Sequence, residues 1–278
     1  MSAALPRDRD ARSLAEAGYA ALLRAVGAKR DQLLLIGGLV PEHLVSSDEP
    51  HQGTNDVDVL LDIGLVYDRD ALDFGWLERA LEIAGFVTSS PNTGWRWVKD
   101  VGGFPIQVEF LVDVLDSADQ EIALPGTTTL GAKNLRGPGP ALRDVCDTVV
   151  AGEAAMVAGL GGYLAAKGAS AYWRRADKDL YDFGWVLVAD LRSGERRAAT
   201  AVRRVLDPLT ERDRADALLA VCDLFSGPGA LGATTYARLS IAAGSVEVPD
   251  NLALDAVVAV DVFRTELSAL FDDRRESR

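Results

Sequence analysis

The segment GTNDVDVLLD, residues 53–62, constrains the fold and the chemistry of this chain more than any other stretch. It reads as a buried β-strand, yet it carries carboxylates two residues apart, at Asp56 and Asp58. Side chains two apart in a strand point to the same face, about 6–7 Å apart along the chain. Two like charges placed in this way repel each other in a partly apolar site unless a cation lies between them. The segment therefore predicts a strand that carries a metal site.

A glycine pair precedes this strand. The segment DQLLLIGGLV predicts a short apolar strand that runs into Gly37 and Gly38. Because glycine has no Cβ, a glycine pair lets a phosphate approach the backbone closely. The strand with the two aspartates could then hold Mg²⁺ against those phosphates, since Mg²⁺ accepts one or two carboxylates together with phosphate oxygens. We therefore expect a phosphate-bearing substrate and Mg²⁺ as cofactor, with Mn²⁺ as an alternative.

Two-metal phosphoryl transfer needs a third carboxylate from a neighbouring strand. The segment FPIQVEFLVDVL, residues 104–115, predicts a strand with one apolar face. Glu109 and Asp113 share its other face. Glu109 is the preferred third ligand, because it lies in mid-strand between apolar neighbours, where an unpaired carboxylate would be costly. Asp113 is the alternative ligand.

The rest of the N-terminal half reads as mixed α/β. Helical periodicity predicts helices over residues 10–27 and 68–86, and TGWRWVKDV forms a predicted hairpin with the strand of Glu109. Residues 124–142 hold many turn formers and predict a loop, and DVCDTVVAG predicts a short strand. From about Met156 the chain reads as helical to its end.

The predicted fold class is therefore α+β. A mixed-sheet catalytic domain, residues 1–155, precedes an all-helical C-terminal domain, residues 156–278.

One predicted helix of the C-terminal half carries an unusual set of charges. In LAAKGASAYWRRADKDLYDFGWVL, a continuous helix would place Lys167, Arg174, Lys178 and Asp182 on one stripe. Three cations with one acid on a stripe predict that an external anion completes the charge balance. A triphosphate fits that description.

These motifs resemble a known superfamily. IGG, TNDVDVLL and VEF resemble the signature of the nucleotidyltransferases that include DNA polymerase beta, and the charged helix resembles that of the AbiEii and MenT-like nucleotidyltransferase toxins. The resemblance implies a mixed-sheet catalytic domain that transfers an NMP from an NTP, such as ATP, to a hydroxyl and releases pyrophosphate. It also implies a helical domain that closes over the nucleotide.

The resemblance also implies roles for individual residues. Asp56 and Asp58 would hold the metals, and Glu109 would be the third carboxylate and the base for the acceptor hydroxyl. The implied nucleotide-binding residues are Gly37, Gly38, Thr54, Lys167, Arg174 or Arg175, Lys178, Asp179 and Asp182. Thr54 could instead simply start the strand.

The acceptor and the partners follow by resemblance only. The acceptor would be a tRNA or another RNA 3′ end, and the protein would be a toxin that a separate antitoxin neutralises. The best candidate for an RNA-backbone contact is a group of arginines in GERRAATAVRRVL, predicted on one helix face: Arg196, Arg197, Arg203 and Arg204. Two alternatives stay open: transfer to a small molecule such as an antibiotic, and a non-catalytic nucleotide-binding or protein-binding module of the same fold.

Composition limits these possibilities. The chain is 48% hydrophobic and 26% charged, as soluble globular proteins are, and its formal net charge is −13. That charge argues against broad coating of nucleic acid and would suit a cationic small acceptor. Two cysteines and two histidines cannot form a closed zinc site of the usual type. No signal peptide, disulfide framework or membrane span is predicted, so the expected location is the cytoplasm.

Overall fold

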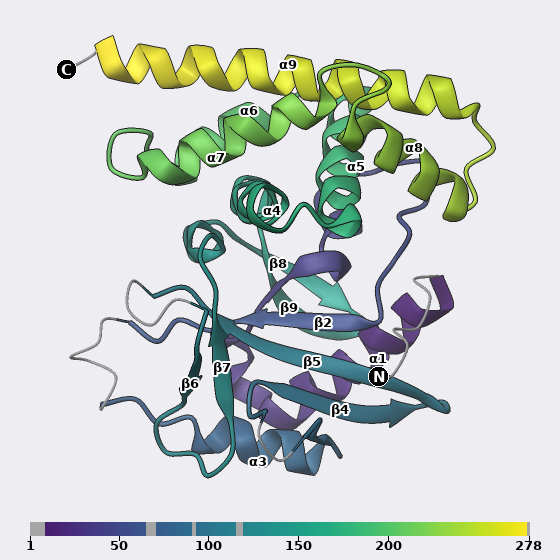
Figure 1. Cartoon of the computed structure of the whole chain (residues 1–278). Helices are drawn as coiled ribbons and strands as arrows, with labels where there is room; N and C mark the ends of the chain where they lie inside the picture. The colour runs from purple at the N-terminus through teal and green to yellow at the C-terminus, as the bar shows by residue number, and fades with distance from the viewer. Residues whose placement is uncertain (1–8, 65–70, 91–92, 115–118, 277–278) are drawn as a thin grey trace. The chain divides into compact units, whose positions relative to one another are not determined.

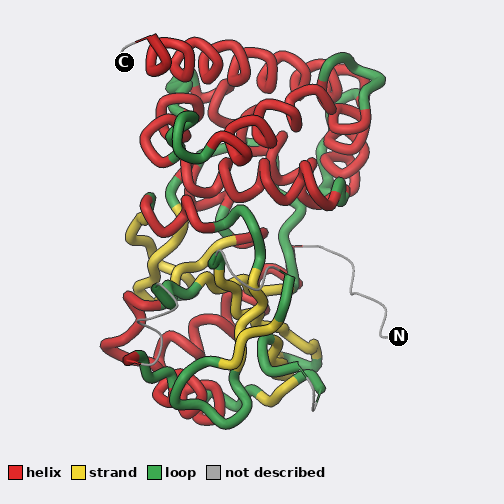
Figure 2. The backbone as a smooth tube through the Cα atoms, turned by 60° about the vertical axis from the view of Figure 1, so that its left-hand side comes forward, coloured by secondary structure: helices red, strands yellow, loops and turns green. Residues whose placement is uncertain are grey.

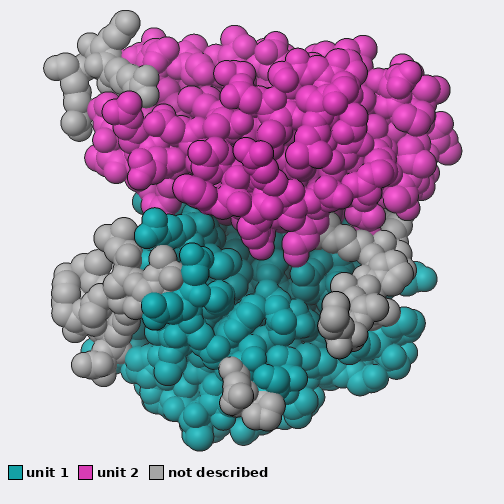
Figure 3. Space-filling model, viewed as in Figure 1, with its two compact units in different colours: residues 1–39, 53–158 teal, residues 40–52, 159–278 magenta. Residues whose placement is uncertain are grey.

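The computed structural model describes residues 9–64, 71–90, 93–114 and 119–276. The chain forms two compact units, which Figure 3 colours separately. Unit 1 comprises residues 1–39 and 53–158, and unit 2 comprises residues 40–52 and 159–278. Strands gather in the first unit and helices in the second (Figure 2). This arrangement confirms the predicted α+β class.

The predicted division at residue 155 differs from the observed one in two respects. The sheet continues to residue 158, and the segment 40–52 belongs with the helices. This segment packs on unit 2 because α2 (Pro41–Leu44) contacts α5 (Asp177–Ser193), and because the Tyr181 hydroxyl accepts a hydrogen bond from the Gln52 N–H. Between the glycine pair and the aspartate strand, the chain therefore leaves unit 1 after Leu39 and returns to it at Gly53.

Unit 1 combines helices and helical turns with a set of strands (Figure 1). Its helices and helical turns are α1 (Arg9–Val26), η1 (Gly27–Gln32), η2 (Gly37–Leu39), α3 (Gly75–Ile83) and η4 (Gly139–Arg143). Its strands are β1 (Leu34–Ile36), β2 (Asp56–Leu60), β3 (Val87–Thr88), β4 (Arg96–Val101), β5 (Phe104–Val112), β6 (Glu121–Ala123), β7 (Gly131–Asn134), β8 (Val145–Val150) and β9 (Glu153–Ala158).

All these strands join one mixed sheet in the order β3-β4-β5-β2-β1-β9-β8, and β7 adds to β5 and carries β6. The aspartate strand β2 lies in the interior of the sheet, antiparallel to β1 and parallel to β5. The β4–β5 pair is the predicted hairpin across residues 102 and 103. The predicted strand in DVCDTVVAG is β8.

Helix α1 fixes which face of the sheet is buried. It packs across β2, β4, β5, β8 and β9, and α3 packs against it (Figure 1). Gly18 allows this close approach, because a Cβ there would lie 3.0 Å from Cγ2 of Ile106 on β5. Val57 and Val108 are fully buried, as Ile106 is. Because side chains alternate along a strand, Asp56 and Asp58 lie on the opposite face.

Three sequence predictions in unit 1 need correction. The helix predicted over residues 68–86 spans only Gly75–Ile83, and residues 68–70 lie outside the described residues. The predicted loop 124–142 contains β7 and η4. Met156 lies in β9, not in a helix, because this segment pairs with both β1 and β8 and the sheet overrides the helix propensity of its Ala, Glu and Met residues.

Unit 2 is a helical assembly around α5. Besides α2 and α5 it contains α4 (Leu160–Arg174), α6 (Ala198–Val205), α7 (Arg212–Cys222), η5 (Asp223–Phe225), α8 (Leu231–Ala242) and α9 (Pro249–Glu276). Residues 179–190 of α5 are all buried, and α4, α8 and α9 pack around them. Phe183 lies at the centre, with ring centroids 6.2 Å from Phe225 and 5.9 Å from Phe263. No helix among the described residues combines the length and the apolar character needed to cross a bilayer.

Candidate active site and the charge cluster of unit 2

The carboxylates of unit 1 meet on one face of the β2–β5 pair. In the parallel register Asp58 is opposite Glu109, and Asp56 is opposite Gln107. All four side chains are half-buried, whereas Val57 and Val108 between them are buried against the other face. Residues that are directly paired across neighbouring strands carry their side chains on the same face. The structure therefore places Asp56, Asp58 and Glu109 on one face of the sheet, and their predicted binding of a metal stays a prediction.

Gly37 lies directly against Asp58. Its φ is +78°, a backbone conformation that residues with a Cβ rarely adopt. A Cβ at this position would lie 1.9 Å from Oδ2 and 2.8 Å from Cγ of Asp58. Gly38 is buried in the same turn, η2. The first glycine therefore makes room for a carboxylate; whether the pair also binds phosphate stays a prediction.

Thr54 holds Asp56. It is fully buried, and its hydroxyl donates a hydrogen bond to Oδ1 of Asp56. This contact fixes the orientation of the first carboxylate of the strand. The predicted contact of Thr54 with the nucleotide stays a prediction.

The two candidates for the third carboxylate have different surroundings. Glu109 accepts hydrogen bonds from Arg96, with Nη2 2.8 Å and Nε 3.0 Å from Oε1, and from the amide of Gln107. Asp113 follows β5 and accepts the backbone N–H groups of Gly137 and Gly139 at 3.0 and 2.7 Å. Asp113 thus shapes the loop before η4. Glu109 is the carboxylate that is in register with Asp58.

The donors on this face suit Mg²⁺. Within the described residues, no three His, Cys, Asp or Glu side chains already form a group that could hold a metal ion. Asp56 and Asp58 offer hard carboxylate oxygens, and Mg²⁺ commonly combines one or two such ligands with substrate phosphates and waters. A pair of aspartates that a substrate completes therefore fits better than a cage made by the protein alone.

In unit 2 the predicted continuous helix is broken. Helix α4 ends at Arg174, Arg175 has φ of 48°, and α5 begins at Asp177. The predicted stripe of Lys167, Arg174, Lys178 and Asp182 therefore does not exist as such. The left-handed residue turns the chain, so that α5 packs back against α4.

The turn nevertheless brings most of these charges together. Lys167 Nζ lies 2.7 Å from Oδ2 of Asp182 and 3.3 Å from Oδ1 of Asp179. Arg174 Nη2 lies 2.9 Å from Oδ2 of Asp179. Asp179 and Asp182 are fully buried, and Lys167 is 7% exposed. The predicted contacts of this group with a triphosphate stay predictions, whereas its internal ion pairs are observed.

His51 also belongs to this cluster, although it lies in the polar segment that connects the glycine pair with the aspartate strand. Its Nε2 lies 3.0 Å from Oδ1 of Asp182, and its side chain is fully buried. Its ring packs on Tyr181 and against the edge of Trp185, with centroids 5.2 and 5.1 Å away. No local pattern could reveal this contact, because the two partners are 131 residues apart in the chain.

Comparison with known proteins assigns no family to this chain. No family model matches the chain, and no curated protein matches it. Among solved structures, the chain is similar to the crystal structure of an antigenic nucleotidyltransferase-like protein from Paracoccidioides brasiliensis. The two share 16% identity with a TM-score of 0.32, over 77% of this chain and 94% of that chain. A similarity at this TM-score carries no argument about function, which therefore rests on the side chains described above.

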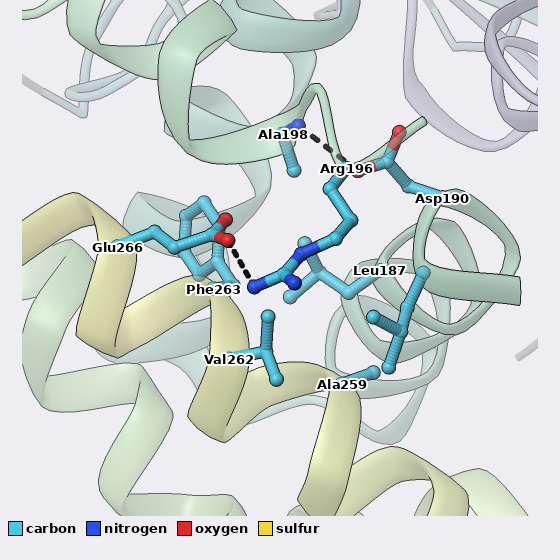
Figure 4. A pocket seen from close by; sticks show the side chains of 9 residues that line it. Leu187, Asp190, Arg196, Ala198, Ala259, Val262, Phe263 and Glu266 are labelled. Carbon is cyan, nitrogen blue, oxygen red and sulfur yellow. Dashed lines mark hydrogen bonds and ion pairs between the residues drawn. The ribbon is translucent and has the colours of Figure 1, made fainter. Parts of the chain in front are cut away.

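The arginine group predicted on one helix face is not formed. Arg196 and Arg197 precede α6, which begins at Ala198. Arg196 has φ of 49° and pairs with Glu266 over a small pocket between α5 and α9 (Figure 4). Arg197 pairs with Glu195 at 2.7 Å and donates a hydrogen bond to the Leu44 carbonyl. Arg196 and Arg197 therefore both form ion pairs within unit 2. The pocket and its rim give no support to an RNA contact.

Proposed function

We propose that this protein is a Mg²⁺-dependent nucleotidyltransferase that moves an NMP from an NTP to the 3′ hydroxyl of a tRNA or another RNA. One observation carries the proposal: Asp56, Asp58 and Glu109 lie on the same face of two adjacent parallel strands, and a glycine turn lies against Asp58. An interior strand with two carboxylates on one face is a costly arrangement for a scaffold alone. It is a suitable one for phosphoryl transfer.

In the proposed reaction each residue has a definite task. Asp56, oriented by Thr54, and Asp58, seated against Gly37, would hold Mg²⁺. Bound Mg²⁺ would supply Lewis-acid stabilisation of the charge on the phosphate oxygens. Glu109 would accept the proton of the acceptor hydroxyl at a carboxylate oxygen.

The proposed transfer forms one phosphoester bond and breaks one phosphoanhydride bond. The hydroxyl oxygen attacks the α-phosphorus in line, a new phosphoester bond forms, and the bond to the bridging oxygen of the β-phosphate breaks. Pyrophosphate leaves, and Glu109 takes the hydroxyl proton. Arg96 contacts Glu109 in the structure and would keep this carboxylate in position.

The test is a labelling assay. The protein is incubated with each α-³²P-labelled NTP in turn, Mg²⁺ and total cellular RNA. We expect label from one NTP in a tRNA-sized band, and none with the Asp56→Ala/Asp58→Ala protein. Equal labelling by the two proteins would refute the assignment of the aspartates. Label in a small molecule instead of RNA would show that the acceptor is that small molecule and not RNA.

We also propose, from the resemblance to nucleotidyltransferase toxins alone, that the activity arrests growth and that a separate antitoxin protein neutralises it. Expression of the intact chain should then stop growth, and Asp58→Asn should restore it. Growth that continues with a fully active enzyme would refute the toxin role and leave the enzymatic proposal untouched.

A further inference from the structure

We propose that the C-terminal end of α4 is a docking surface for the unpaired end of a nucleic-acid strand. This surface, called the α4 corner, consists of Tyr172, Trp173, Arg174 and Arg175. The inference rests on the proposed function only in naming that strand as the acceptor. Binding of a strand to the α4 corner can be measured without any transfer reaction.

Trp173 is exposed to solvent at the α4 corner. Its side chain is 65% exposed, whereas the other four tryptophans are buried or half-buried. Tyr172 supports it by an edge-on contact, with ring centroids 4.8 Å apart and planes at 80°. An indole that is braced by a neighbour yet open to water offers a flat surface on which a base can stack. Such stacking tolerates every base, because each base has a π-face.

Two positively charged residues, Arg174 and Arg175, follow Trp173 in the chain. Arg174 is held by Asp179 while its side chain stays 51% exposed. Arg175 is exposed, and it forms no ion pair with any residue that the structure describes. Its left-handed backbone, with φ of 48°, sets it at the turn between α4 and α5. Two arginines that directly follow an exposed tryptophan in the chain offer the kinds of side chain that bind stacked bases and their phosphates.

The openness of the α4 corner favours a strand over a free nucleotide. Free nucleotides bind in concave sites that bury most of their surface. A strand instead gathers stacking and phosphate contacts along an open groove or surface. The net charge of −13 would repel nucleic acid elsewhere, so local arginines are needed for any contact.

The experiment compares two labelled RNA hairpins, one with an unpaired 3′ overhang of about four nucleotides and one with a blunt end. Binding is measured by fluorescence anisotropy with the full chain, without NTP. We expect tighter binding of the overhang, and a loss of roughly tenfold or more in Trp173→Ala. Trp173→Phe should restore much of the affinity, because it keeps an aromatic face. Arg175→Gln should lower the slope of log affinity against log salt by about 0.7.

Arg212→Gln is the matched control. Arg212 is an exposed arginine of unit 2 at the start of α7, and 78% of its side chain is exposed. Its loss should leave affinity and salt slope unchanged. The proposal is overturned if no hairpin binds, if overhang and blunt hairpins bind alike, or if Trp173→Ala binds as the unmodified protein does. It is also overturned if Trp173→Ala weakens NTP binding alone.

The labelling assay separates this inference from the proposed function. A protein that binds the overhang through Trp173 but transfers no nucleotide would refute the enzyme and retain the docking surface. A protein that transfers nucleotide equally well with Trp173→Ala and shows no overhang preference would retain the enzyme and refute the docking surface. Circular dichroism melting checks that each variant is folded.

Discussion

At the scale of single residues, the contact between Gly37 and Asp58 decides the geometry of the candidate active site. A glycine at this point relieves both a left-handed backbone and a steric conflict with a carboxylate. The sequence predicts that the glycine pair lets a phosphate approach the backbone. The structure adds a second reason for its first member, since any side chain would push Asp58 from its place.

Gly37→Ala should therefore reduce nucleotidyl transfer by about a hundredfold, because the Cβ displaces Asp58 by an ångström or more. The measurement is the initial rate of labelling. Gly27→Ala is the matched control, since Gly27 has φ of +59° but no atom within 4 Å of its Cβ position. If both variants lose the same activity, backbone strain and not the displacement of Asp58 explains the effect.

At the scale of elements, glycines determine how closely helices pack around α4. A Cβ at Gly161 would lie 2.2 Å from the carbonyl oxygen of Ala201 on α6, which is backbone. A Cβ at Gly168 would lie 2.2 Å from Cδ1 of Leu218 on α7, the flexible end of a side chain. A glycine inside a helix is typical of a close approach, and at Gly168 the structure identifies the neighbour as Leu218.

Gly161→Ala should destabilise the protein by about 1–3 kcal/mol, since a helix backbone must move. Gly168→Ala should cost less, because Leu218 can change rotamer and alanine favours the helix by up to about 1 kcal/mol. Urea unfolding of the two variants beside the parent protein provides the comparison. A larger loss for Gly168→Ala would contradict this account of the packing.

Helix α3 is tied to a distant turn by one carboxylate. Glu78 accepts the backbone N–H groups of Thr128, Thr129 and Leu130 at 2.8, 2.6 and 2.9 Å. Partial burial raises the pKa of Glu78, but these hydrogen bonds and the charge of Arg79 lower it by more, so the net pKa lies below its usual value. A carboxyl with a lowered folded-state pKa stabilises the protein above its unfolded pKa, and this stabilisation is lost as the pH falls through the folded-state pKa.

Glu78→Gln should consequently lower the free energy of unfolding by about 1 kcal/mol at pH 7, and the difference from the parent protein should shrink as the pH falls below about 4. Denaturant titrations at several pH values measure both quantities. Glu82→Gln, an exposed change on the same helix, serves as the control and should have little effect at any pH. A difference for Glu78→Gln that is constant with pH would contradict the carboxylate explanation.

At the scale of the whole molecule, the segment 40–52 stands out because it belongs to unit 2 although unit 1 precedes and follows it in the chain. The buried pair of His51 and Asp182 holds this segment to α5. Asp182 in turn bonds Lys167 on α4. His51 therefore adds a buried contact to those of α2 and Gln52 that join this segment to the helices of unit 2.

His51→Ala should accelerate hydrogen exchange in residues 40–52 and lower stability by about 2–3 kcal/mol, because a buried carboxylate loses a hydrogen bond. Exchange followed by mass spectrometry measures the local effect. His43→Ala, in the same segment but only half-buried, should change the exchange far less. Equal effects of the two substitutions would show that His51 does not hold the segment in place.

The sequence by itself determined the features that depend on local periodicity. The period of two in a strand places Asp56 and Asp58 on one face, and alternation around a glycine turn indicates the β4–β5 hairpin. The same alternation separates Glu109 from the buried face of β5. These predictions hold because they depend on the backbone geometry of neighbouring residues alone.

Only the tertiary structure decided the rest. Residues 153–158 have the composition of a helix but form β9, because two strands were available to pair with them. The turn at Arg175, the approach of Gly37 to Asp58 and the burial of His51 against Asp182 all depend on partners outside any local pattern. Contacts of this kind are fixed by packing and charge pairing in three dimensions, which periodicity along the chain does not encode.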